Sequence, residues 1–206
     1  MDSKELSILI KDFFPEMAID FVAKQIISLN FRLVISKKRF SKLGVFRPSR
    51  NSNKHVISIN GDLNNDLFYL VYLHEVAHLI VWNNYKKRVA PHGKEWKEEY
   101  YKILLYSINN NHFSDEIKKY ITVSLTKPNF HTSVTRDLYK INSESSQNES
   151  LLRVKDLPEN CIFTLYNKRN FKLIQKIRTR YKCQDINNGR FYLVHSLAEV
   201  KKYCTN

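Results

Sequence analysis

The sequence has few cysteines, few glycines and no long apolar run, and each shortage excludes a class of protein. Cys161, Cys183 and Cys204 are widely spaced and form no C-x-x-C pair, so neither a disulfide framework nor a zinc ribbon is expected. The four glycines form no Gly-rich phosphate loop, so nothing indicates a use of ATP. No segment has the apolar length of a membrane span, and the N-terminus lacks a signal-peptide layout. We therefore expect a cytoplasmic protein that binds neither ATP nor a membrane.

Acidic residues are also scarce, and the imbalance of charge lies in two segments. The 206 residues include 34 lysines and arginines against 20 acidic residues, a formal net charge of +14. Residues 31–55 contain eight basic residues and no acid, while residues 151–206 contain twelve basic and four acidic residues. Each segment thus contributes +8, and the rest of the chain −2. A basic segment is often only a solvated surface, but this concentration favours a polyanionic partner, nucleic acid first.

Two histidines four residues apart are the central feature of the apolar stretch 70–85. On a helix His74 and His78 lie one turn apart on one face, with Glu75 beside them in the H-E-x-x-H pattern. Two imidazoles can bind zinc, and the carboxylate can take a proton from the metal-bound water, whose pKa zinc lowers to roughly 7. Histidine and glutamate are costly in apolar surroundings without a partner, so a zinc site is a better interpretation than two core histidines. This chemistry suits peptide-bond hydrolysis.

A catalytic zinc normally has three protein ligands, and the residues alone leave the third open. His92 is the best candidate, because it lies at a Pro-His-Gly turn where the chain can fold back on the metal. Glu95, Glu98 and Glu99, on the helix predicted at 94–106, are its competitors, since some zinc proteases take a glutamate from a following helix. Their alternative role is a solvated helix face.

The order of elements predicts an α+β fold with helices packed on a small β-sheet. Strands are expected from β-branched runs, and Asn64 or Asn65 can cap the H-E-x-x-H helix. The other expected elements are helices from residue 3, after Pro15 and at 115–125, and strands at 32–38, 44–47 and 55–60. His112 and His131 are expected at the surface.

A polar, serine-rich stretch at 141–150 predicts a linker. It would separate a domain at 1–140 from a small basic β-rich domain at 151–206. In the second domain, strands at 162–166 and 171–174 and strands at 177–184 and 190–194 predict two hairpins. Its aromatic core is expected to comprise Phe163, Tyr166, Phe171, Tyr181, Phe191 and Tyr192.

Alternation along the strand predicted at 177–184 would give it one core face and one basic face. The basic residues share that face and could contact nucleic acid, with a solvated edge as the alternative. The candidates in this stripe are Lys176, Arg178, Arg180 and Lys182. In the first domain the corresponding candidates are Lys37, Lys38 and Arg39.

Four stretches together resemble the SprT-like (Spartan-like) zinc metalloprotease family. They are residues 35–44, HVISINGDLN from His55, HEVAH from His74 and HGKEW from His92. The resemblance covers residues 10–140 and implies a zincin-like metalloprotease domain. Carried over by position, it implies His74, His78 and His92 as ligands of one catalytic Zn²⁺ and Glu75 as the catalytic base.

The resemblance also implies a substrate class, because eukaryotic members of the family cleave proteins crosslinked to or bound on DNA and are stimulated by DNA. Many members end in a zinc ribbon, whereas the C-terminal unit here offers only Cys161 and Cys183 in that region. We therefore expect a zinc endopeptidase with a protein substrate, a DNA partner and a C-terminal domain without zinc. The alternatives are a non-catalytic nucleic-acid-binding protein with a structural zinc, and a zinc protease whose substrate is unrelated to DNA.

Overall fold

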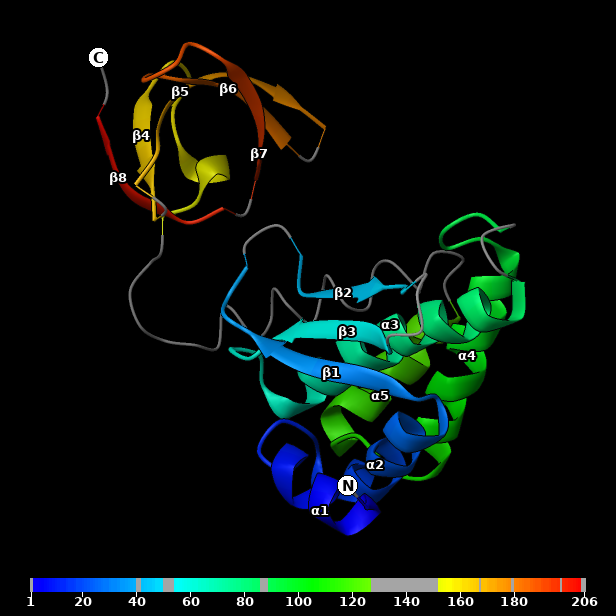
Figure 1. The fold of residues 1–206 in the computed structure, drawn as a ribbon. Coiled ribbons are helices and arrows are strands. Elements are labelled where there is room, and N and C mark those ends of the chain that lie inside the picture. The colour runs from blue at the N-terminus through cyan, green and yellow to red at the C-terminus, as the bar shows by residue number, and fades with distance from the viewer. Residues whose placement is uncertain are drawn as a thin grey trace. The chain divides into compact units, whose positions relative to one another are not determined.

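The structure is a computed structural model that describes most of the chain in two compact units (Figure 1). One unit comprises residues 2–39 and 43–126, and the other comprises residues from 152 to 204. The described residues are 2–39, 42–49, 54–85, 89–126, 152–166, 168–178, 180–196 and 198–204. The predicted linker at 141–150 and His131 lie outside them.

The first unit combines helices with a three-stranded sheet. Its helical elements are α1 (Ser3–Ile10), the 3-10 turn η1 (Glu16–Ala18), α2 (Ile19–Ser28), α3 (Asn65–Tyr85), α4 (Lys94–Asn109) and α5 (Asp115–Leu125). Its strands are β1 (Phe31–Ser36), β2 (Gly44–Arg47) and β3 (His55–Asn60). The mixture of helices and sheet confirms the α+β prediction, and the three predicted strands all form. A short 3-10 turn follows Pro15 before α2 begins.

The sheet has the order β1-β3-β2, with β1 parallel and β2 antiparallel to β3. Helix α3 packs against β2, β3 and α4, as Figure 1 shows. Its side chains are buried on nearly every side, as expected of a helix that is apolar all round. The Asn64 side chain accepts a hydrogen bond from the Leu67 backbone N–H (2.9 Å) and so caps α3, one of the two caps predicted. The H-E-x-x-H motif is therefore held on the most buried helix of the unit.

The second unit is an antiparallel sheet with the order β7-β6-β5-β4-β8 and its own apolar core. The strands are β4 (Ile162–Leu165), β5 (Asn170–Ile177), β6 (Arg180–Asp185), β7 (Phe191–His195) and β8 (Val200–Cys204), preceded by the 3-10 turn η2 (Val154–Asp156). Phe163, Phe171 and Tyr181 are buried in this core as predicted. Tyr166 and Phe191, by contrast, are about half exposed, at 48% and 56%.

Strand β6 confirms most of the strand predicted at 177–184 and its hairpin with β7, but the predicted start is wrong, because the chain reverses there. Strand β5 continues to Ile177, and Arg178 then adopts a left-handed φ of +49° between β5 and β6. Glycine and asparagine are the residues that usually adopt this conformation. Because Arg178 is neither, the sequence gives no signal for the turn. Ile177 consequently pairs with Arg180 and is 40% exposed.

No helix among the described residues has both the length and the apolar character needed to cross a membrane.

Candidate metal centre

Helix α3 supplies the first two histidines of the candidate site. His74 and His78 are half-buried and lie one turn apart, with ring centroids 5.1 Å from each other. Both rings therefore leave α3 on the same side, as the spacing of four residues predicts. Glu75 between them is buried, with 7% of its surface exposed.

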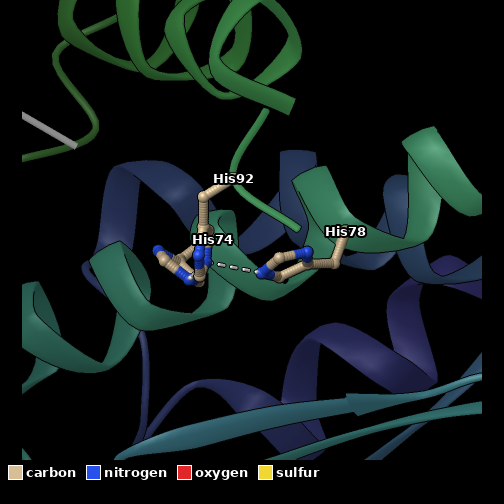
Figure 2. Close-up of side chains that lie close together, drawn as sticks. All are labelled: His74, His78 and His92. Atoms are coloured by element: carbon tan, nitrogen blue, oxygen red, sulfur yellow. Dashed lines mark hydrogen bonds between the residues drawn. The ribbon is translucent and has the colours of Figure 1, made fainter. Parts of the chain in front are cut away.

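The third histidine comes from the turn between α3 and α4. His92 adopts a left-handed φ of +59°, and the Gly93 N–H donates to the Ala90 carbonyl (2.9 Å), which closes the turn just before α4. This turn brings the His92 ring onto α3 (Figure 2). His92 Nε2 lies 3.1 Å from His74 Nε2 and 3.0 Å from His78 Nε2.

The spacing of these nitrogens suits a metal ion. With metal–nitrogen bonds of 2.0–2.1 Å, two nitrogens of a tetrahedral zinc site lie about 3.3 Å apart. Here the Nε2 separations of 3.0 and 3.1 Å are close to that value, and the three ligand atoms lie within 4.8 Å of one another. The three histidines can therefore hold a metal ion, and they are the only such group of His, Cys, Asp or Glu among the residues that the structure describes.

The surroundings favour the neutral imidazoles that bind metals. Burial, and then the neighbouring His92, lower the pKa of His78 to about 4. Burial also lowers the pKa of His92. Both rings are therefore uncharged near neutral pH and can present a lone pair to a cation.

Helix α4 provides an aromatic wall behind the histidines. The Trp96 ring is buried and its centroid lies 4.6 Å from that of His74 and 4.5 Å from that of His92. Tyr100 stacks on Trp96 at 4.9 Å. The sequence places both residues on the apolar side of the predicted helix, but its spacing does not show that they contact the histidines.

Strand β2 closes the other side of Glu75. A Cβ atom added to Gly44 would lie 2.7 Å from Glu75 Oε1 and 2.6 Å from Val71 Cγ1, so only glycine leaves room for this carboxylate. Positive charge is also near: burial and Arg47 lower the pKa of Arg39, while the Glu75 carboxylate opposes that shift. Sequence reasoning gave Gly44 no part in the site.

Two of the three competing glutamates on α4 form ion pairs with lysines of the same helix. Glu98 forms an ion pair with Lys94 (3.9 Å), and Glu99 forms one with Lys102 (2.8 Å). None of the glutamates predicted as alternatives joins the described metal-binding group, which contains histidines alone.

The basic residues proposed for nucleic acid occupy varied positions. Lys37 and Lys38 are exposed after β1, whereas the Arg39 guanidinium donates to the Asn60 Oδ1 (2.7 Å) and to the Ser58 carbonyl (3.0 Å). Arg39 thus ties the segment after β1 to β3. A role for these three residues in binding nucleic acid stays a prediction.

In the second unit the basic stripe is divided by the turn at Arg178. Arg180 and Lys182 share one face of β6, and Lys182 Nζ lies 4.4 Å from the centroid of the exposed Phe191 ring on β7. Lys176 lies near the end of β5, and Arg178 lies in the turn. Nucleic-acid contacts by these residues also stay a prediction.

The fold and the site together define a mixed α+β protein with a three-histidine centre capable of binding a metal. A comparison with known protein families matches residues 14–118, just over half of the chain, to the SprT-like family, and the chain therefore belongs to that family. Searches among curated proteins and among solved structures each found no match.

Proposed function

We propose that the protein is a zinc-dependent endopeptidase with a zincin-like domain. The observation that carries this proposal is that the buried Glu75 stands on α3 between His74 and His78, two members of a three-histidine cluster. A purely structural metal site has no need of an adjacent carboxylate that is not a ligand. Membership of the SprT-like family supports the same conclusion.

His74, His78 and His92 would hold the zinc ion through their Nε2 atoms. When bound, zinc supplies Lewis-acid chemistry, which polarises a carbonyl and makes a water acidic enough to react near neutral pH. Glu75 acts as the general base: one of its carboxylate oxygens accepts a proton from the attacking water and later returns it to the leaving amine. Gly44 keeps open the space in which this carboxylate lies.

We further propose that the substrates are proteins bound or crosslinked to DNA. The charge of the chain supports this substrate class, because the whole net positive charge lies in segments 31–55 and 151–206. DNA would concentrate its bound proteins near the protease through phosphate contacts.

Cleavage of a DNA-binding protein tests both parts of the proposal. Wild type and Glu75→Gln are loaded with zinc and compared with and without single-stranded DNA, with Glu98→Gln as the matched control on the exposed side of α4. We expect cleavage by wild type and the control only, and faster cleavage with DNA. Equal cleavage by Glu75→Gln would refute the mechanism, whereas cleavage that ignores DNA would refute the substrate class alone.

The charge distribution also favours a second candidate, a non-catalytic nucleic-acid-binding protein. Binding of single-stranded DNA should weaken steeply as salt rises, and replacing Arg180 and Lys182 by glutamate should make that dependence shallower. Replacement of the exposed helix residues Lys4 and Lys24 by glutamate is the control. An unchanged salt dependence would show that the β6 residues do not contact DNA. Salt-dependent binding without any Glu75-dependent cleavage would favour this second function.

A further inference from the structure

An apolar hollow opens directly beside the candidate metal centre. It has a volume of about 360 Å³ and reaches His78 itself. All its other walls are aliphatic or aromatic, contributed by β2 and the segment after it, by α3, by the turn that leads to α4, and by α4 itself. They are Phe46, Pro48, Val81, Trp82, Val89, Ala90, Pro91 and Trp96.

Strand β2 runs from the catalytic carboxylate to this hollow. Gly44 and Phe46 pair with Ile59 and Ile57, whose side chains are fully buried on the α3 side of the sheet. Gly44 accordingly faces Glu75, and the Phe46 ring lies 6.5 Å from that of Trp82, two helical turns further along α3. The hollow is therefore displaced from Glu75 along the direction of the strand.

The position of β2 in the sheet suits an extended peptide. Within the described part of the chain β2 pairs with β3 alone and forms one edge of the sheet. An edge strand can bind an extended peptide through backbone hydrogen bonds, and alternate peptide side chains then enter pockets beside it. A peptide aligned on β2 would pass the metal centre and the hollow in turn.

We propose that this hollow is a specificity pocket that takes one large apolar side chain, aromatic or branched, at a fixed distance from the bond that is cut. The inference rests on the proposed peptidase function. The walls offer an apolar side chain a dry contact, while a charged side chain would lose its water without gaining a partner. The volume lies within the usual range for ligand pockets and is enough for one large side chain.

The test uses short peptides composed of Gly, Ser and Asn with a single Phe. The matched control peptides have Asp in place of that Phe. Wild-type protein loaded with zinc should cut at the same distance from Phe wherever Phe is placed. The kcat/KM should be about 10- to 100-fold lower for the Asp peptide, as expected from the loss of one buried aromatic side chain. Cleavage at sites unrelated to Phe would overturn the proposal.

Variants of the walls give a second test. Val89→Asp places a carboxylate in the half-buried wall and should change the preferred side chain from Phe to Lys. Val123→Asp on α5 is the control, because Val123 is 57% exposed and lies outside the hollow, and it should leave the preference for Phe unchanged. Ala90→Trp is the alternative variant if Val89→Asp does not fold. It fills the hollow from an exposed position that does not disturb the core, and it should abolish the preference for Phe. Zinc content and melting temperature of each variant verify that the fold is intact. An unchanged Phe preference in a folded wall variant would overturn the proposal.

Binding separates this proposal from the peptidase function. Zinc-loaded Glu75→Gln should bind the Phe peptide about tenfold or more tightly than the Asp peptide. If the Phe peptide is preferred in binding but wild type cuts neither peptide, the pocket stands and the peptidase function fails. Equal binding of the two peptides would overturn the pocket, even if wild type cleaves proteins.

Discussion

Replacing Gly44 by alanine should damage catalysis without removing a metal ligand. The new Cβ would lie 2.6 Å from Val71 Cγ1 and 2.7 Å from Glu75 Oε1. Ordinary contacts between carbon atoms are 3.5–4.0 Å, so the helix side chains or the strand must move by about 1 Å. Overpacking of this kind costs roughly 1–3 kcal/mol of unfolding free energy. A displacement of about 1 Å at a catalytic group lowers the rate on the order of 100-fold.

The assay compares Gly44→Ala with Gly61→Ala, where an added Cβ would also make one contact under 3.0 Å. A Cβ on Gly61 would lie 2.7 Å from Ile35 Cγ2, and none of its three nearest atoms belongs to Glu75 or to a histidine. Both variants should lose stability and keep zinc, as measured by chemical denaturation and metal analysis. Only Gly44→Ala should also lose kcat/KM by about 100-fold on the folded fraction. Wild-type activity in Gly44→Ala would refute the argument that this glycine makes room for the catalytic carboxylate.

Four further outcomes follow from the structure. Removal of zinc by a chelator should lower the melting temperature by roughly 5–10 °C where free zinc is about 100-fold above its dissociation constant, and mutation of any of the three histidines should abolish that shift. A thiol reagent should label only the exposed Cys204 in the native protein, but all three cysteines after denaturation. The reason is that Cys161 and Cys183 are buried, and burial raises the pKa of Cys183 to about 12. Rapid labelling of Cys183 in the native protein would contradict its burial. Tyr69→Phe should cost about 1–3 kcal/mol in chemical denaturation, because the Tyr69 hydroxyl is hydrogen-bonded to buried His112, whereas Tyr106→Phe at a half-exposed ring should cost little. Burial also lowers the pKa of His112, so the unfolded chain binds a proton at this residue more readily than the native state does. The unfolding free energy should therefore fall as the pH drops below 6.5. It should fall less in His112→Gln.

Local patterns were sufficient to predict most elements of the first unit. The strands formed where β-branched residues cluster between polar segments, and α3 formed where an apolar run follows a capping asparagine. The relation of His74, Glu75 and His78 was predictable for the same reason, because helical geometry alone fixes residues within one turn. These features depend on neighbours in the sequence.

Features that depend on distant residues could not be predicted. His112, expected at the surface, is 5% exposed because α4 and its following turn bring it onto the Tyr69 hydroxyl of α3, 2.9 Å away. The reversal at Arg178 likewise depends on the pairing of β5 with β6, which holds a disfavoured backbone conformation that the local sequence does not signal. In both cases tertiary contacts override the local preference.

The three-histidine cluster itself depends on one turn whose conformation the sequence leaves open. From the residues alone His92 was the best candidate and the glutamates of α4 were its competitors, because each could approach α3 for some path of the intervening chain. The left-handed conformation of His92 selects one path, since it directs the ring onto α3 while α4 begins at Lys94. The buried Trp96 then contacts the rings of both His74 and His92, so the packing of α4 holds the turn in place. The position of the third histidine thus depends on how two helices pack, and the spacing of residues along the chain does not reveal that packing.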